Sequence, residues 1–226
     1  MVREKDKFRI SQILIMKITK LGHCCMIIED AGMKILTDPG MYTTEQNVLK
    51  DIDIILITHE HGDHLHIESV KAVLANNPDA KVITNSSVGN ILSSENIVFE
   101  TLEDGQSKKF GQILIEGFGT KHAEIFEEYG QVLNTGYFIQ NKLFFPGDAL
   151  YIPPKKVEVL AFPTAGSWAN IKESINYVME VKPVKGFPVH DGGFKSTQFV
   201  YGVYKTIIPP KGIEVILPEL GKEFEV

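Results

Sequence analysis

The chain reads Thr58-His59-Glu60-His61-Gly62-Asp63-His64 directly after the apolar run DIILIT at residues 53–58. The unbroken apolar run predicts a strand covered on both faces. A loop that leaves a strand end can turn several side chains toward one point, whereas a helix would splay these positions around its axis. Imidazole and carboxylate are ligands that Zn²⁺ and similar divalent ions prefer. The stretch therefore predicts a metal site, in preference to a solvated loop with incidental histidines.

Short apolar runs bounded by Gly, Pro and Asp continue on both sides of this stretch. Before it, we expect three strands of a meander, at residues 13–18, 24–29 and 33–37. After it, helical spacing predicts helices at 67–76 and 86–92, with strands at 81–84 and 97–99. Antiparallel strands are expected next, at 107–110, 112–116, 136–140 and 142–145.

The last third of the chain returns to alternating strands and helices. Strands are expected at 157–161, 184–189 and 213–217, with helices at 171–181 and 196–205. Two mixed β-sheets packed face to face, with helices outside, satisfy these burial patterns. The order of elements thus predicts an α/β protein in four layers, an αββα sandwich.

One domain over residues 16–226 is the simplest organisation, because the chain has no internal repeat, low-complexity tract or linker. Met16 opens a natural domain start, MKITKLGH. Residues 1–15 are therefore interpreted as an N-terminal extension of uncertain role, either a misassigned start or an extra edge strand.

The composition narrows the class of protein. The net charge is −6, which gives no long-range attraction to phosphate backbones and makes a nucleic-acid partner unfavourable. No segment is long and apolar enough to span a bilayer, and no signal peptide is evident, so we expect a cytoplasmic protein without a membrane partner. The two cysteines, Cys24 and Cys25, are adjacent in an apolar run. They favour buried, reduced thiols over a metal or redox role.

The pattern H-x-H-x-D-H after an apolar strand resembles the signature of the metallo-β-lactamase superfamily. Further matching elements follow in the superfamily's order: Gly117 to His122 with a lone histidine, Phe144 to Asp148 with a Gly-Asp pair, and Phe187 to His190 at a strand end. Together they cover the chain from about Met16 to His190. The resemblance implies the four-layer metallo-β-lactamase fold.

The resemblance also implies two divalent metal ions per chain, with Zn²⁺ most expected and Mn²⁺ or Fe²⁺ as alternatives. One ion would be held by His59, His61 and His122, and the other by Asp63, His64 and His190, with Asp148 bridging the two. Two such ions lower the pKa of a bridging water, so that hydroxide forms near neutral pH. Asp63 would be the catalytic residue, orienting this nucleophile or accepting its proton.

Differences from the sequences of other branches indicate which branch of the superfamily this chain resembles. Asp148 stands where true β-lactamases of this fold carry a cysteine, and His61 stands where flavodiiron oxidoreductases have glutamate. Leu21-Gly22-His23, the run ILTDP at 35–39 and the short chain are most similar to the branch of ascorbate-6-phosphate lactonase and small hydrolases.

Four further residues are candidates for contacts around the metals. Asp38 is expected to hydrogen-bond a ligand histidine, the alternative being a turn before Pro39. His23 could reach the substrate or serve as a core histidine. Trp168 could form a wall of the substrate pocket or pack in the core. Lys121 could contact an anion or be a solvated lysine.

These observations predict a metal-dependent hydrolase that acts on a small, anionic ester, lactone or phosphodiester. A nuclease of the same fold and a non-catalytic metal- or ligand-binding module are the alternatives. The sequence is compatible with a homo-oligomer. It does not identify the substrate.

Overall fold

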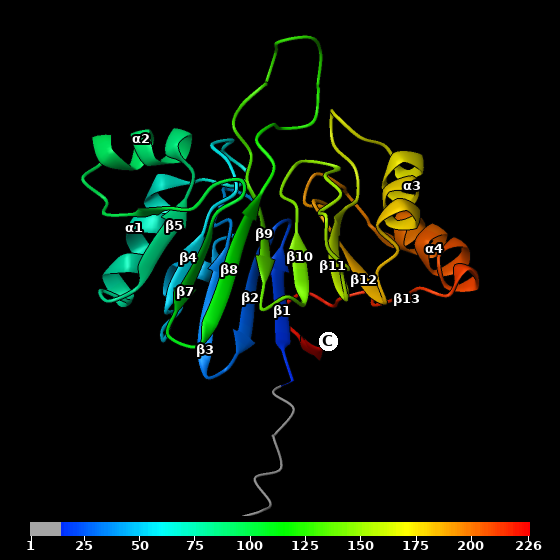
Figure 1. The fold of residues 1–226 in the computed structure, drawn as a ribbon, viewed down its shortest axis with the longest axis horizontal. Coiled ribbons are helices and arrows are strands. Elements are labelled where there is room, and N and C mark those ends of the chain that lie inside the picture. Colours follow the sequence, from blue (N-terminus) through cyan, green and yellow to red (C-terminus); the bar gives the residue numbers. More distant parts are fainter. Residues whose placement is uncertain (1–14) are drawn as a thin grey trace, which may run out of the picture.

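The computed structural model describes residues 15–226, which form two seven-stranded sheets facing each other (Figure 1). The first sheet has the order β14-β1-β2-β3-β4-β5-β6. Its strands are β1 Lys17–Gly22, β2 Cys25–Asp30, β3 Met33–Thr37, β4 Ile54–Leu56, β5 Lys81–Thr84, β6 Glu100–Thr101 and β14 Glu223–Glu225. The strands β1 to β3 form an antiparallel meander, and β3 to β6 pair in parallel.

The second sheet has the order β13-β12-β11-β10-β9-β8-β7. Its strands are β7 Ser107–Phe110, β8 Ile113–Phe118, β9 Gly136–Ile139, β10 Leu143–Phe145, β11 Val159–Pro163, β12 Lys185–Val189 and β13 Glu214–Val215. The pairs from β7 to β10 are antiparallel, and those from β10 to β13 are parallel. Both sheets are therefore mixed, as predicted.

Helices cover the outer face of each sheet. On the first sheet, α1 (Ile67–Asn76) and α2 (Ser86–Ser94) bury one apolar face each against β4 and β5. On the second, α3 (Ile171–Val181) and α4 (Gln198–Ile207) pack against β11. Asn170 starts α3 with a capping box, in which its side chain accepts from the amide of Glu173 and the Glu173 carboxylate accepts from the amide of Asn170. Short 3-10 helices lie at Glu45–Val48 and Pro209–Lys211.

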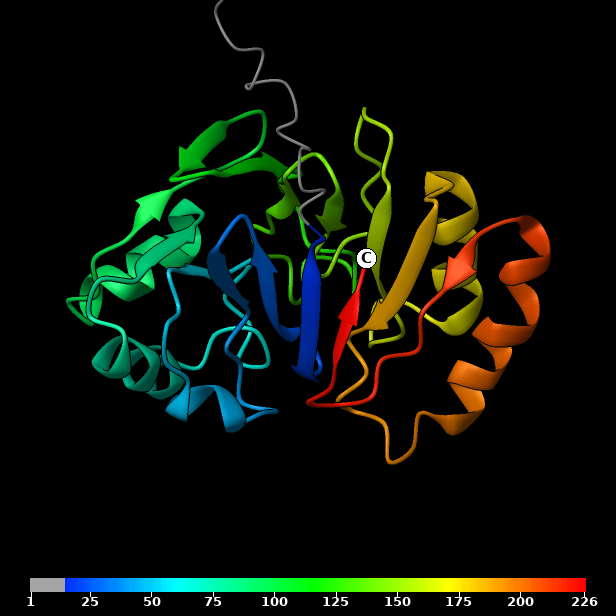
Figure 2. The same cartoon turned by 90° about the horizontal axis from the view of Figure 1, so that it is seen from below.

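The main apolar core lies between the two sheets. Inward-facing residues such as Ile18, Ile28 and Ile54 meet Ile115 and Phe145 from the other sheet, all without exposed surface. Figure 2 shows the same arrangement from below, with the helices on the two flanks and the sheets between them. The four-layer αββα sandwich predicted from the sequence is thus confirmed.

Three details of the predicted elements are wrong. Strand β1 begins at Lys17, not before it, and Ile15 lies outside any strand. Residues 97–99 form no strand, because Asn96 adopts a left-handed conformation and the amide of Ile97 bonds back to the carbonyl of Leu92 in α2. The edge strand β14 was not predicted, and it pairs with β1 at the margin of the first sheet. The proposed extension, apart from Ile15, lies outside the described residues.

The topology brings the carboxyl ends of many strands to one edge of the sandwich. Strands β3 and β4 run in parallel in the first sheet, and β8, β10, β11 and β12 point the same way in the second. The loop of residues 119–135 between β8 and β9 rises above this edge (Figure 1). Across residues 15–226, none of the helices has the length and apolar character needed to cross a membrane.

Candidate metal centre

The histidine-rich stretch forms a tight loop after β4. The amides of His64 and Leu65 both bond to the carbonyl of His61, and the amide of Met41 bonds to the carbonyl of Gly62. Gly40 lies so close that a Cβ there would be 1.8 Å from the carbonyl oxygen of Asp63. A glycine is therefore required at residue 40, where the loop after β3 packs against the metal loop.

The structure gathers the predicted ligand residues at the strand ends described above. His59, His61, Asp63 and His64 follow β4, while His122, Asp148 and His190 follow β8, β10 and β12. Candidate ligand atoms lie within 4.8 Å of one another in overlapping groups, namely His59 with His61 and His122, His59 with His64 and Asp148, and His23 with Asp63, His64 and His190. Residues more than 100 positions apart in the chain thus meet at one point.

Three histidines of the cluster donate their Nδ1 protons to fixed oxygen atoms. The Nδ1 atom of His64 lies 2.7 Å from Asp38 Oδ2, and that of His190 lies 2.8 Å from the carbonyl of Ala165. His122 Nδ1 lies 2.5 Å from the carbonyl of Ala123. Carbonyl and carboxylate oxygens only accept hydrogen bonds, so the proton of each neutral ring is on Nδ1 and the lone pair is on Nε2.

The hydroxyl of Thr58 sets the same tautomer for His59. Thr58 Oγ1 donates its single proton to Asp38 Oδ2 at 2.8 Å. It can therefore only accept from His59 Nδ1, which lies 2.9 Å away. Asp38 accepts a third hydrogen bond, from the amide of Thr58 at 2.8 Å. Asp38 thus accepts a hydrogen bond from His64. The sequence predicted such a bond to a ligand histidine beside the metal loop.

The Nε2 lone pairs converge on Asp148. Within the described residues, the buried atoms without a hydrogen-bond partner include Asp148 Oδ1 and the Nε2 atoms of His59, His64, His122 and His190. The Nε2 atoms of His190 and His122 lie 2.8 and 3.3 Å from Asp148 Oδ2, and that of His64 lies 3.1 Å from Oδ1. Buried polar atoms rarely stay unpaired. Lone pairs facing a carboxylate repel one another unless a cation lies between them, so the donor set fits divalent metal ions.

The electrostatics of the cluster agree with this fit. Burial lowers the pKa of His59 well below its usual range, which keeps the ring neutral as a metal ligand must be. Burial opposes the charge of Asp148, but His64 and His190 hold the pKa of its carboxyl well below the usual range. At His64, burial disfavours the imidazolium, yet the carboxylates of Asp148 and Asp38 raise its pKa well above normal. Carboxylates that attract a proton to this point also attract a cation.

Asp63 lies at the open side of the cluster. Its side chain is 24% exposed, whereas that of Asp148 is 2% exposed. Burial disfavours the Asp63 carboxylate, but the hydrogen bond from His23 and the proximity of His64 lower its pKa to about 2. The Asp63 carboxylate is therefore ionised at neutral pH and accessible from solvent.

Trp168 contacts the cluster from the loop between β11 and α3. Its indole Nε1 donates to Asp148 Oδ2 at 3.0 Å, and its ring meets the rings of His122 and His190 edge-on. The side chain is only partly buried, so it lines the site and does not pack in a core. Trp168 thus lines a cavity beside the cluster, the first of the two positions that the sequence left open.

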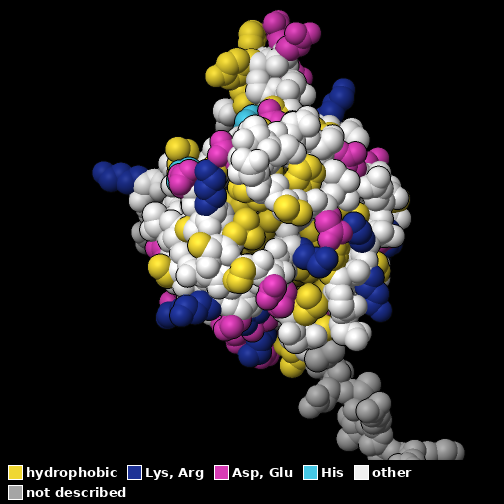
Figure 3. Space-filling model, turned by 90° about the vertical axis from the view of Figure 1, so that its left-hand side faces the viewer, with side chains coloured by type: hydrophobic (Ala, Val, Ile, Leu, Met, Phe, Trp, Pro, Cys, Tyr) yellow, Lys and Arg dark blue, Asp and Glu magenta, His cyan; other side chains and the backbone are white. Residues whose placement is uncertain are grey.

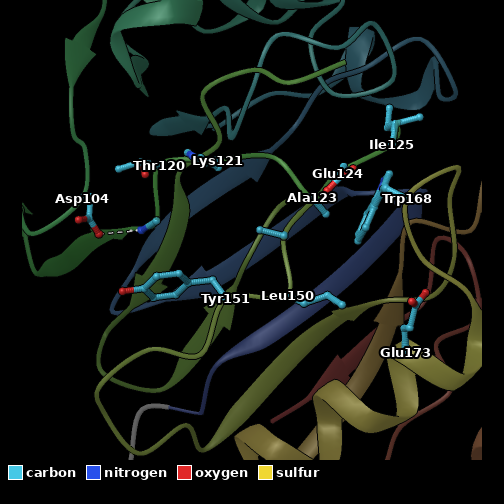
Figure 4. A pocket seen from close by; sticks show the side chains of 12 residues that line it. Asp104, Thr120, Lys121, Ala123, Glu124, Ile125, Leu150, Tyr151, Trp168 and Glu173 are labelled. Carbon is cyan, nitrogen blue, oxygen red and sulfur yellow. Dashed lines mark hydrogen bonds between the residues drawn. The ribbon is translucent and has the colours of Figure 1, made fainter. Parts of the chain in front are cut away.

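Two cavities open beside the cluster. The larger, of about 650 Å³, has Trp168 at one end and Asp104 and Tyr151 at the other, with Lys121 along its wall (Figure 4). Lys121 is exposed, so its ammonium group is solvated at the rim of this cavity. The smaller, of about 350 Å³, is lined by His23, Tyr42, Asp63, Ala165, Gly166, Ser167, His190, Gly193 and Phe194. Both cavities suit groups of small-molecule size.

The loop above the site is acidic and apolar. Its tip exposes Phe126 and Tyr129 beside Glu127 and Glu128. Figure 3 shows these two classes of side chain at the summit of the molecule, and shows Lys and Arg interspersed with Asp and Glu on the face below. This face presents no continuous basic surface to a nucleic acid.

Sequence analysis missed several residues that shape the site. Asn134 is buried; its side chain donates to the carbonyl of Pro146 and accepts from the amide of Asp148, fixing the turn that carries this carboxylate. Lys20 lies at an inward position of β1 and contacts Asp191 at 2.6 Å. Lys20 could have been predicted to form a buried ion pair, because it stands at an inward position of an alternating strand. Asn134 could not have been predicted, because it lies in an irregular loop.

Comparison with known proteins places the chain among metallo-hydrolases. The sequence profile of the beta-lactamase superfamily domain matches residues 17–190. A UPF0173 metal-dependent hydrolase of Carboxydothermus hydrogenoformans is 29% identical over 196 residues, which cover 77% of this chain and 84% of the relative. The exodeoxyribonuclease WalJ of Streptococcus pneumoniae is 33% identical over a shorter stretch of 117 residues, 45% of this chain and 42% of that enzyme.

The fold is also found among solved structures. A metallo hydrolase of the archaeon Ignicoccus hospitalis superposes with a TM-score of 0.76 at 18% sequence identity. The superposition covers 94% of this chain and 98% of that protein. The likeness extends over both sheets and therefore supports the fold.

Proposed function

The chain belongs to the beta-lactamase superfamily, and we propose that this metal-dependent hydrolase holds two divalent ions and cleaves a small, anionic ester, lactone or phosphodiester. The observation that carries the proposal is the convergence of four buried Nε2 atoms on Asp148, whose Oδ1, like these nitrogens, has no hydrogen-bond partner among the described residues. Such a set of donors is costly to bury unless cations complete it.

The donors divide into two sets around Asp148. We assign His59, His61 and His122 to the first set, and Asp63, His64 and His190 to the second. The candidate ligand atoms of each set lie within 4.8 Å of one another, and His23 lies equally near the second set. Asp148 reaches members of both sets, since its Oδ1 lies 3.1 Å from His64 Nε2 and its Oδ2 3.3 Å from His122 Nε2. Imidazole-rich donors with a shared carboxylate favour Zn²⁺, with Mn²⁺ or Fe²⁺ as alternatives.

Two bound ions would lower the pKa of water and stabilise the negative charge of the transition state. Asp63 would orient the attacking water or accept its proton, because its carboxylate is ionised and lines the smaller cavity. Asp38 holds the ring of His64, and the indole of Trp168 holds Asp148. Lys121, at the rim of the larger cavity, attracts an anionic group of the substrate.

A nuclease is the second candidate function, because part of the chain is similar to the exodeoxyribonuclease WalJ. The net charge of −6 and the glutamates at the tip of the loop over the site favour a small substrate over a polynucleotide. A phosphodiester remains common to both candidates, so substrate size is the property that separates them.

Metal content and a substrate panel test the proposal together. We expect close to two ions per chain by elemental analysis, a loss of both in Asp148→Ala, and no loss in His66→Ala. His66 is the matched control because it lies in the same stretch but bonds Ser69 at the start of α1. A wild-type protein that binds neither Zn²⁺ nor Mn²⁺ when these are supplied would refute the metal centre.

The panel comprises a lactone, a bis-aryl phosphodiester, a chromogenic cephalosporin and a single-stranded oligonucleotide. We expect hydrolysis of the lactone or the phosphodiester, and little turnover of the cephalosporin. Oligonucleotide cleavage, with binding that weakens steeply as salt rises, would support the nuclease instead. A metal-loaded protein inert toward all four would favour a binding module.

A further inference from the structure

A histidine outside the two ligand sets enters the site from the turn between β1 and β2. His23 is 3% exposed, and its Nε2 lies 3.2 Å from Asp63 Oδ2. We propose that His23 is a positioning residue, which donates its Nε2 proton to Asp63 and so fixes the orientation of that carboxylate. The proposal rests on the role of Asp63 in the proposed function.

The tautomer of His23 is opposite to that of the ligand histidines. The backbone amide of Gly192 donates to His23 Nδ1 at 3.0 Å. An amide N–H is only a donor, so Nδ1 carries the lone pair and the proton of the neutral ring is on Nε2. In His64 the proton is on Nδ1 and the lone pair is on Nε2. His23 is therefore set to donate toward the centre, where the other rings present lone pairs.

The position of His23 is held by the loop after β12. Its backbone is in the left-handed region, with φ of 50°, and its carbonyl accepts from the amide of His190. Gly192 approaches so closely that a Cβ there would lie 3.0 Å from His23 Cβ and 2.9 Å from the ring of Tyr42. The buried pair of Lys20 and Asp191 anchors the same loop. A strained, buried backbone held from several sides is a costly arrangement that is typical of functional positions.

The carboxylate of Asp63 needs such a partner. Within residues 15–226, His23 is the one side chain that hydrogen-bonds Asp63. By contrast, Asp38 accepts from His64 and twice from Thr58. With Oδ2 held by His23, the orientation of the Asp63 carboxylate is fixed. The same oxygen faces the centre, 3.7 Å from His190 Nε2 and 3.9 Å from His64 Nε2. Without His23, a carboxylate that is 24% exposed can rotate, and its alignment is lost.

Two substitutions separate the roles of the two ring nitrogens. The amide nitrogen of Gln in His23→Gln can take the place of Nε2 and donate to Asp63. The side chain of Asn in His23→Asn can accept from Gly192 but is too short to reach Asp63. We expect His23→Asn to lower kcat by about 10- to 100-fold with a small change in KM. We expect His23→Gln to keep most of the wild-type kcat.

Two readouts do not depend on turnover. Elemental analysis should show two ions in both variants, and the visible spectrum of the Co²⁺-loaded protein should change in His23→Asn but not in His23→Gln. The ¹⁵N NMR spectrum of histidine-labelled, metal-free protein should show a protonated Nε2 for His23, assigned by its loss in His23→Gln.

Three results would overturn the proposal. One is loss of an ion in both variants, which would make His23 a ligand. Another is a protonated Nδ1 for His23 in the NMR spectrum. The third is wild-type kcat in His23→Asn. A wild-type protein that binds no metal, yet shows the expected tautomer, would instead refute the proposed function.

Discussion

The two proposed ligand sets occupy the same edge of the sandwich but differ in charge and in the burial of single residues. In the first set, His59 and His122 donate their Nδ1 protons to neutral oxygens, a hydroxyl and a carbonyl. In the second, His64 donates to the buried carboxylate of Asp38, and Asp63 brings a further carboxylate. His64 has no exposed side-chain surface, whereas His61 is half-buried.

This difference predicts that the two proposed sites hold their ions with unequal affinity. More negative charge strengthens the attraction for a divalent ion. We therefore expect the second set to bind its ion more tightly than the first.

Removing one histidine from each set should have very different structural costs. In His64→Ala, Asp38 stays buried without the ring it contacts at 2.7 Å, so the free energy of unfolding of the metal-free protein should fall by about 3 kcal/mol. In His61→Ala it should fall by less than about 1 kcal/mol. Urea denaturation in the presence of a chelator measures both. Equal destabilisation by the two substitutions would remove the structural distinction between the sets.

The carboxylate of the second set should matter for turnover. Asp63→Asn keeps the shape of the side chain but removes its charge, so kcat should fall by a factor of about 10² or more. Asp104→Asn is the matched control, because Asp104 lines the larger cavity and the amide can still accept from the amide of Gly119. The proposed role of Asp63 fails if the two variants have similar kcat values.

Asp38, which accepts a hydrogen bond from His64, should affect the affinity for one ion only. Asp38→Asn weakens the acceptor for the His64 ring, and we expect one of the two ions to bind about 10- to 100-fold more weakly. Competition with a chromogenic chelator resolves the two affinities. If Asp38→Asn weakened the binding of both ions equally, the two sets would not be independent.

The cysteine near the second set should have the smallest effect. Cys24 lies close to Asp38 and His64, which makes a thiolate ligand geometrically conceivable. Burial, however, raises the pKa of Cys24 well above its usual range and that of Cys25 to about 12, so both stay protonated at neutral pH. Cys24→Ala with Cys25→Ala should keep both ions, and neither native thiol should react with iodoacetamide at pH 8. Loss of an ion would add sulfur to the second set.

Local patterns in the sequence were sufficient for the elements that position the centre. The helices predicted at 67–76 and 171–181 match α1 and α3, because their periodic apolar faces are local in the chain. The loop at 59–64 was predicted from its residue types after an apolar run, whereas His122, Asp148 and His190 were assigned through the resemblance to the metallo-β-lactamase superfamily. Residue types and strand ends can both be predicted from the local sequence.

Other features depended on contacts between distant parts of the chain. Strand β14 forms because β1 leaves an open edge, which no local pattern at 223–225 reveals. The tautomers of His59 and His64 depend on Thr58 and Asp38, and the opposite tautomer of His23 depends on Gly192, 169 residues away. Residue types and their order along the chain were enough to predict which groups bind a metal. Which nitrogen of each ring faces the centre depends on the folded protein, because packing sets the hydrogen-bond partner on the other side of the ring.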